Sequence, residues 1–341
     1  MAVKKKPQNK GGFFRGLARF MLLLFGLACA LGFWLYQYAS TPLLQNTPQD
    51  FVVASGGVKK VADQLVKQGV IDQALPFLVL ARISGKDKQL KAGSYNLTAA
   101  VSPWQLLEKL SNGDTTTLTF TLIEGANWRE LRKSLNSNPH LRHDTALMSD
   151  AELLAELGVS AISPEGLFFP DTYHVDKGSS DLKLLARSHQ RMQAKLDKAW
   201  AERSANVQLK TPYEALILAS LVEKETGHAK DRALVAGVFV NRLRIGMRLQ
   251  TDPAVIYGVG DSLDGRLRKV DLLTDTPYNT YTRSGLPPTP IAMVGDAALK
   301  AALNPAPTTA LYFVAKGDGS SVFSNTLDEH NSAVRKYILN R

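Results

Sequence analysis

A run of twenty uncharged, mostly apolar residues, Phe20–Ala39, constrains this chain more than any other feature. At about 1.5 Å per residue, a helix of this length spans ~30 Å, which is the thickness of a bilayer's hydrocarbon core. The run ends in Trp34, Tyr36 and Tyr38, and aromatic residues gather at membrane interfaces. A signal peptide has a shorter apolar region followed by a small-residue cleavage site. We therefore predict an uncleaved transmembrane helix over residues 20–39.

The positive charge is concentrated before this run and predicts its orientation. More than half of the net charge of +10 comes from six residues that precede the run: Lys4, Lys5, Lys6, Lys10, Arg15 and Arg19. Because the positive flank of a membrane helix stays inside the cell, residues 1–19 are predicted to form a cytoplasmic tail, with the rest of the chain outside. The excess left after these six is small and no nucleic-acid-binding motif accompanies it, so we expect no nucleic-acid partner.

The usual sequence motifs for binding metals or cofactors are not found in this chain. The only cysteine, Cys29, lies inside the apolar run, so the exported part has no disulfide framework and no cysteine zinc site. No His-Glu-x-x-His motif and no phosphate-binding glycine loop is present. We expect neither a metal nor a cofactor.

Hydrophobic patterns predict two regions after the membrane helix, both of mixed α+β class. Residues 48–117 are predicted to form a small βααβ-type module, in which a further helix has Ser102 as its N-cap and Pro103 at its first position. Residues 118–341 are predicted to form a larger α+β domain. Its expected helices and hairpin are Leu182–Ser204, Pro212–Thr226, Lys230–Leu243, Gly295–Leu303 and the strand pair Leu311–Ala315 with Ser321–Phe323.

The segment Ala215–Gly227 reads A-L-I-L-A-S-L-V-E-K-E-T-G, an apolar helix that runs into two glutamates. A helix that is apolar on nearly all faces belongs in a core, where an unpaired carboxylate is costly. Glu223 and Glu225 lie about 200° apart around the helix, so they cannot face the same pocket. We predict that one of them projects into a cleft with a raised pKa, as a catalytic acid does. The alternative is a helix end whose glutamates simply reach solvent.

Two polar stretches follow and could line such a cleft. After Gly246, which is expected to end a helix, Gln250, Thr251, Asp252 and Tyr257 are predicted to lie on a loop. Residues 277–291 are rich in Tyr, Asn and Thr and contain four prolines. Amide and hydroxyl groups match sugar hydroxyls, and tyrosine rings stack on pyranose rings. An ordinary proline-rich surface loop is the alternative.

Several sequence blocks resemble the YceG-like, or MltG, family of endolytic murein transglycosylases. They are EGLFFPDTY (165–173), LASLVEKET (218–226), VNRLRIGMRLQTDPAVIYG (240–258), YNTYTRSGLPPTP (278–290) and FSNTLDEHN (323–331). The small module is similar, more weakly, to LysM modules, which grip cell-wall glycan. The resemblance implies cleavage of the MurNAc–GlcNAc β-1,4 bond of peptidoglycan glycan strands with formation of 1,6-anhydro-MurNAc ends, terminating nascent strands.

The resemblance also implies a location, partners and site residues. It places the chain in the bacterial inner membrane with a periplasmic catalytic domain, and peptidoglycan synthases (penicillin-binding proteins) are the expected partners. A single glutamate, carried over as Glu223, would perform both proton steps. The expected cleft lining is Glu165, Gln250, Asp252, Tyr257, Tyr278, Asn279 and Asn325. Two other readings remain open: a non-catalytic glycan-binding scaffold, and a hydrolase that pairs Glu223 with Glu165 or Asp252.

Overall fold

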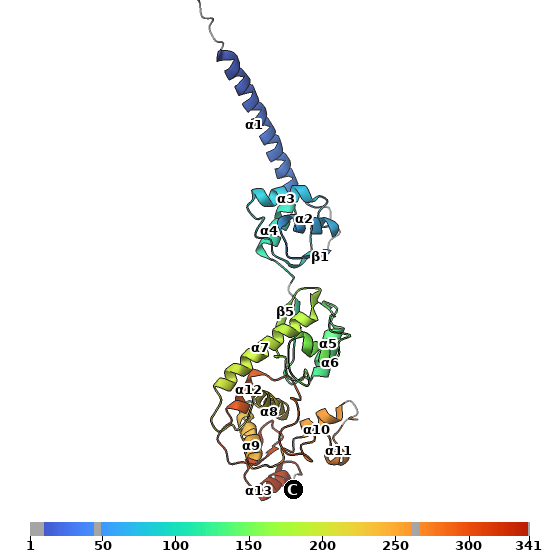
Figure 1. The fold of residues 1–341 in the computed structure, drawn as a ribbon, viewed down its shortest axis with the longest axis vertical. Coiled ribbons are helices and arrows are strands. Elements are labelled where there is room, and N and C mark those ends of the chain that lie inside the picture. The colour runs from blue at the N-terminus through green and yellow to red at the C-terminus, as the bar shows by residue number, and fades with distance from the viewer. Residues whose placement is uncertain (1–9, 44–48, 117, 261–262, 264–265, 340–341) are drawn as a thin grey trace, which may run out of the picture. The chain divides into compact units, whose positions relative to one another are not determined.

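The computed structural model describes residues 10–43, 49–116, 118–260, 263 and 266–339, with only the backbone of residues 10–18 (Figure 1). Lys4, Lys5 and Lys6 of the predicted cytoplasmic tail therefore lie outside the described residues. The chain divides into two compact units, residues 1–118 and 119–341.

The first unit begins with the long helix α1 (Lys10–Ser40). Its stretch Arg19–Ser40 has a mean hydropathy of 1.8, is exposed except for a few partly buried residues at its C-terminal end, and is long and apolar enough to cross a membrane. A helix therefore forms where the apolar run predicted one.

The remainder of the first unit is a small module with its own core. Strands β1 (Gln49–Val53) and β2 (Gly93–Leu97) pair antiparallel, and helices α2 (Val58–Lys67) and α3 (Ala74–Ile83) lie between them in sequence. The rings of Phe51 and Tyr95 stack across the strand pair at 5.5 Å between centroids. This is the predicted β–α–α–β order, whereas the LysM-like identity of the module stays a prediction.

Helix α4 (Pro103–Asn112) follows the module's strands and begins where its local signals predict. The Ser102 hydroxyl accepts the Gln105 N–H, and the Gln105 side chain accepts the Ser102 N–H, which together form a capping box. Gly113 ends the helix with φ 78°, a left-handed conformation that glycine adopts without strain. The predicted N-cap and first position are confirmed.

The second unit is built mainly from helices, with three two-stranded sheets. Strand β3 (Leu118–Thr121) pairs with β5 (Thr172–Val175), β4 (Leu141–Arg142) lies parallel to β6 (Ser179–Ser180), and β7 (Tyr312–Ala315) forms a hairpin with β8 (Ser321–Ser324). Its helices are α5 (Trp128–Ser137), α6 (Asp150–Glu156), α7 (Asp181–Ala201), α8 (Pro212–Glu225), α9 (Arg232–Arg244), α10 (Asp252–Val259), α11 (Lys269–Leu273), α12 (Asp296–Leu303) and α13 (Leu327–Tyr337).

Helix α8 is the centre of this unit. Every residue from Ala215 to Val222 is buried, and helices α7, α9, α10 and α12 all contact α8. The hydroxyl of buried Ser220 donates to the Ile217 carbonyl at 2.7 Å and accepts the Ile291 N–H at 3.0 Å. The core helix predicted from its apolar sequence is therefore present, and its C-terminal end carries the two glutamates to the edge of the core.

One predicted loop is wrong. Asp252 and Tyr257 lie in helix α10, not on a loop, and only Gln250 and Thr251 precede the helix. Thr251 is the N-cap residue, and Pro253 occupies the first turn, where its missing N–H costs no hydrogen bond. The polar residues at this start led to the loop prediction, because a short helix offers little apolar periodicity.

Candidate functional site

The two glutamates at the end of α8 lie in different surroundings, as the helical period requires. The Glu225 carboxylate accepts a hydrogen bond from the Thr251 hydroxyl at 2.6 Å. The Glu223 carboxylate instead accepts the backbone N–H of Gly295, the N-cap residue of α12, at 3.0 Å. Each glutamate therefore belongs to a distinct candidate site.

Glu225 opens onto a polar pocket of about 360 Å³, which we call the Glu225 pocket. It brings together two of the residues predicted to line the cleft, Gln250 and Asp252, with charged, aromatic and apolar side chains from four other segments. Its lining is Glu225, Arg242, Leu249, Gln250, Asp252, Tyr281, Tyr312, Phe313, Leu327 and His330.

Hydrogen bonds join the two polar stretches at this pocket. The Thr251 N–H donates to the Thr280 hydroxyl at 3.0 Å, and the Gln250 N–H donates to the Thr280 carbonyl at 3.1 Å. The Tyr281 hydroxyl donates to Asp252 at 2.6 Å. Residues about thirty positions apart are thus held as one wall, with amide, carboxylate and phenol groups facing the cavity.

Gln250 has a backbone conformation that side chains rarely adopt. Its φ is 48°, and among the described residues it is the one non-glycine with a positive φ. Such a conformation costs on the order of 1–3 kcal/mol and persists where surrounding contacts enforce it, commonly at functional sites. Here the enforcing contacts are the bonds to Thr280.

The surroundings of Glu225 favour its protonated form. Burial raises the pKa of this carboxyl, and the nearby negative charge of Asp252 raises it further. The hydrogen bond from Thr251 and the charge of Arg242 act in the opposite direction and do not outweigh burial. A carboxyl whose pKa is raised beside a polar cavity is suited to donate a proton to a bound oxygen.

Glu223 also has a raised pKa, mainly through burial and then through the charge of Glu124, whereas the Gly295 N–H lowers it. Glu124 lines a separate pocket of about 390 Å³ with Gly125 and Met293. Neither Glu223 nor any residue predicted to line the cleft is among the residues that line this pocket. The role of Glu223 stays a prediction.

Glu165 is a buried support. Its side chain is 1% exposed, both of its carboxylate oxygens accept the Trp128 N–H, at 3.0 and 2.9 Å, and one accepts the Tyr257 hydroxyl at 3.0 Å. Burial raises the pKa of Glu165 to about 7. The ring of Tyr257 packs edge-on against Tyr278 at 4.9 Å between centroids. These three residues form one internal cluster away from the Glu225 pocket lining.

The two asparagines predicted to line the cleft also lie elsewhere. Asn279 is fully buried, and its amide donates to the carbonyls of Asp271, Leu272 and Thr274, so it ties a loop together. Asn325 is exposed before α13, and its side chain accepts the Thr309 hydroxyl at 3.0 Å. Neither lines the Glu225 pocket.

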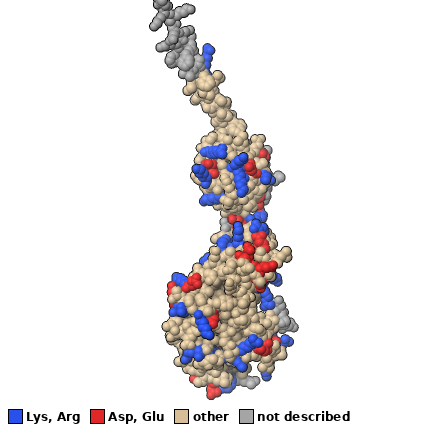
Figure 2. Space-filling view, viewed as in Figure 1, with Lys and Arg blue, Asp and Glu red and all other residues tan. Residues whose placement is uncertain are grey.

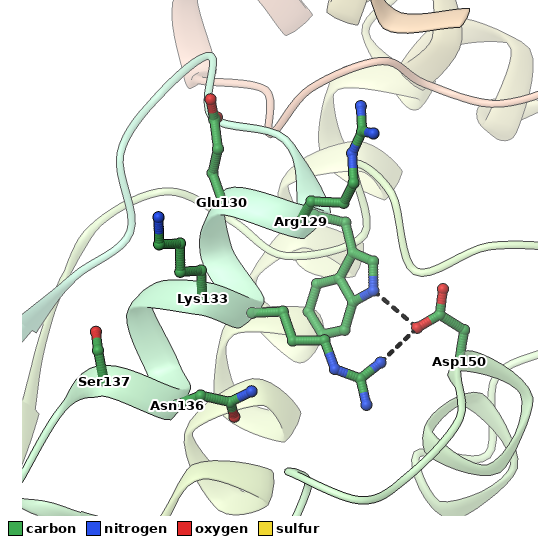
Figure 3. Close-up of a pocket in the computed structure, with 8 residues that line it drawn as sticks. Arg129, Glu130, Lys133, Asn136, Ser137 and Asp150 are labelled. Atoms are coloured by element: carbon green, nitrogen blue, oxygen red, sulfur yellow. Dashed lines mark hydrogen bonds and ion pairs between the residues drawn. The ribbon is translucent and has the colours of Figure 1, made fainter. Parts of the chain in front are cut away.

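A broader pocket of about 990 Å³ lies over α5 (Figure 3). The Trp128 indole and the Arg132 guanidinium both donate to one oxygen of Asp150, at 2.9 and 2.7 Å. Arg129 and Lys133 extend from the same helix. None of the residues predicted from sequence lines this pocket.

The prediction missed Arg242, Tyr281, Tyr312 and His330 in the Glu225 pocket. The Arg242 guanidinium is buried, donates to the carbonyls of Leu311 and Leu249 at 2.6 and 2.7 Å, and lies over the Tyr312 ring. The His330 ring stacks on the Tyr312 ring at 5.3 Å between centroids. Arg242, Tyr281 and His330 lie in the sequence blocks quoted above, but their meeting depends on tertiary structure. Among the described residues, no group of three or more His, Cys, Asp or Glu is arranged to hold a metal ion.

Comparisons with known proteins found a family model, curated relatives and a solved structure that are similar to this chain. A model of the YceG-like family matches residues 51–336. A protein of Bacillus subtilis (strain 168) named endolytic murein transglycosylase is 32% identical over 307 residues, which cover 84% of each chain. One of the same name from Streptococcus pneumoniae serotype 2 (strain D39 / NCTC 7466) is 29% identical, over 93% of this chain and 64% of that protein. A crystal structure of a putative YceG-like protein from Listeria monocytogenes matches with TM-score 0.54 and 28% identity, covering 83% of this chain and 98% of the other.

Proposed function

This chain belongs to the YceG-like family, and from that premise we propose that it is a peptidoglycan lytic transglycosylase. The reaction breaks the β-1,4 bond between MurNAc and GlcNAc and leaves a 1,6-anhydro-MurNAc end. The names of the curated relatives support this class of enzyme. The observation that carries the chemistry is a protonatable carboxyl, Glu225, in a polar pocket at the end of a buried helix.

The choice within the glutamate pair is the main question for the mechanism. The resemblance to the family implies that Glu223 is the catalytic residue. The surroundings favour Glu225, because it shares a pocket with Gln250 and Asp252 and because carboxylate, phenol and guanidinium groups converge there. We therefore place the catalytic role on Glu225, with Glu223 as the alternative that mutagenesis can distinguish.

One carboxyl suffices for this reaction. Protonated Glu225 gives its proton to the glycosidic oxygen as the bond from C1 of MurNAc breaks, and GlcNAc departs with a new hydroxyl group. The resulting carboxylate then accepts the proton of the MurNAc 6-hydroxyl as that oxygen bonds to C1. The products contain all atoms of the substrate, no water is consumed, and the carboxyl regains its proton. Ordinary glycosidases instead use two carboxylates and water.

The remaining cleft residues have supporting roles in this proposal. Asp252, held by the Tyr281 hydroxyl, keeps a negative charge near Glu225 and so favours the acid form. Gln250 offers an amide to sugar hydroxyls. Glu165, Tyr257, Tyr278 and Asn279 hold the walls in place rather than touching glycan, and Asn325 lies outside the pocket.

Mass spectrometry of peptidoglycan digested by the purified chain tests this function. We expect fragments ending in 1,6-anhydro-MurNAc. Reducing ends would identify a hydrolase, which a second carboxylate such as Asp252 could support. Glycan binding without any product would identify the non-catalytic scaffold.

The location follows from helix α1. We propose that it anchors the chain in the bacterial inner membrane, with the N-terminus in the cytoplasm and residues after Ser40 in the periplasm. Tethering raises the effective concentration of the enzyme at newly made glycan near the membrane. This supports a role in ending nascent strands alongside peptidoglycan synthases, with the small module as the glycan-gripping part.

A further inference from the structure

Helix α3 carries an apolar face that the core of its module does not use. Leu75 and Ile83 are 70% and 71% exposed, and Val79, partly buried, lies between them at the same four-residue spacing. We call these three residues the α3 stripe. The opposite face of the helix is buried in the module and consists of Pro76, Phe77, Leu80 and Ala81. The helix is therefore apolar on both faces although only one is covered.

Basic residues accompany this stripe. Arg82 lies in the last turn of α3 and is exposed, and Lys86 and Lys88 follow within six residues. Lysine and arginine side chains are numerous on the module in Figure 2, whereas α1 is uncharged below its upper end. Apolar residues with basic neighbours suit a surface that is apolar within and anionic at its headgroups, which is a phospholipid bilayer.

The end of α1 brings the module to the membrane. Leu35, Tyr38 and Ala39 pack against the module's core, and α1 contacts both α3 and α4 (Figure 1). Tyr38 is one of the three aromatic residues, with Trp34 and Tyr36, that are predicted to lie at the membrane interface, and Leu35 lies between the latter two. The end of α1 therefore packs on the module at the level predicted for that interface.

We propose that the α3 stripe lies in the outer interface of the membrane that α1 spans, so that the module rests on the anionic phospholipid surface. This inference rests on the proposed anchoring by α1. Helix α3 contacts α1 and lies at the end of the module that α1 enters (Figure 1). A second contact with the membrane would restrict how the module turns about its single anchor.

Site-directed spin labelling of the full chain tests this contact. Cys29 is the only cysteine, so a Cys29→Ser background accepts single labels at Leu75→Cys and Ile83→Cys, both on the surface. Asp63→Cys, at an exposed position of α2, is the matched control. The chain that keeps Cys29 carries a label within the span. All are reconstituted into phosphatidylethanolamine–phosphatidylglycerol vesicles and compared for collisions with oxygen, which concentrates in lipid, and with a water-soluble nickel chelate.

We expect the labels at positions 75 and 83 to collide more often with oxygen than with the nickel chelate, as the Cys29 label should. The label at position 63 should collide more often with the nickel chelate. If the labels at 75 and 83 match the one at 63 while the Cys29 label is in lipid, the surface contact is wrong and the anchoring stands. If the Cys29 label also meets nickel freely, the anchoring is wrong, and the contact proposed here falls with it.

Discussion

Single residues at the Glu225 pocket combine strain with polar chemistry. Gln250 keeps a positive φ and at the same time places its side chain on the pocket wall. Glycine would adopt this backbone freely, so the presence of glutamine indicates that its amide has a use there. Burying the Arg242 guanidinium costs free energy unless its N–H groups form hydrogen bonds. Here they donate to the carbonyls of Leu311 and Leu249.

We expect Gln250→Gly to leave the free energy of unfolding unchanged or to raise it by up to about 1 kcal/mol, because it relieves the positive φ. Turnover should fall, because the amide is lost. Gln250→Ala is the matched control: it loses the same amide and keeps the strain. Chemical denaturation and product release from peptidoglycan measure the two effects. A glycine variant less stable than the alanine variant would contradict the strain argument.

We expect Glu225→Gln to lower the rate of anhydro-product formation by roughly 100- to 10,000-fold, the range that general acid–base catalysis supplies. Glu223→Gln should stay within about tenfold of the unmodified chain, because its carboxylate lies outside the Glu225 pocket. Equal melting temperatures and retained glycan binding exclude misfolding. If Glu223→Gln is instead the inactive variant, the assignment carried over from the family is correct and the one from geometry is wrong.

At the scale of elements, buried polar links hold the helices together. Glu165 joins the first residue of α5, through the Trp128 N–H, to Tyr257 of α10. The two helices are more than a hundred residues apart in sequence, and this carboxyl ties them directly. Its burial makes the tie sensitive to protonation.

The unfolding free energy of the second unit should fall as pH rises from about 4.5 to 7. The folded pKa of Glu165, about 7, exceeds its ordinary value of 4.5, so the folded state retains a proton that the unfolded state has lost. The stabilisation from this carboxyl is fully present when the pH is below its ordinary pKa. It is lost as the pH rises through its pKa in the folded state, and the free energy of unfolding falls by ~3 kcal/mol. Hydrogen exchange of the α8 amides at several pH values measures this. Glu165→Gln should make the slope shallower, with Glu223 and Glu225, whose pKa values are also raised, supplying what remains. Glu156→Gln, exposed at the end of α6, should leave the slope unchanged.

Sequence reasoning was most successful where the signals are local. Ser102, Pro103 and Gly113 define α4 through contacts within a few residues, so their roles could be predicted. Helix α10 was missed because its start is polar and its buried part is only Ala254 and Val255. The Glu225 pocket could not be assembled from sequence, because Arg242 and His330 are close only after α9 and α13 have packed. The choice between Glu223 and Glu225 failed to follow from the sequence for the same reason.

At the scale of the whole molecule, the end of α1, the proposed membrane anchor, is also part of a folded core. Leu35 and Tyr38 belong to α1 and pack against the core of the first unit. A fragment that lacks most of α1 should therefore retain Leu35 and Tyr38 if its first unit is to be fully stable. We expect a chain starting at residue 41 to have a first unit less stable by about 1–3 kcal/mol than a chain starting at residue 34, from the lost apolar burial. Thermal unfolding of both fragments measures the difference. Equal stability would show that these contacts contribute nothing.

The burial of α8 has a consequence for how the protein is made. Its eight consecutive buried residues, Ala215–Val222, are covered in part by α12 and by the segment around Ile291, which emerge some seventy residues later. During synthesis, this apolar segment is therefore complete long before its cover exists. The second unit cannot close until its last fifth has been delivered, so the growing chain needs protection from aggregation over that interval.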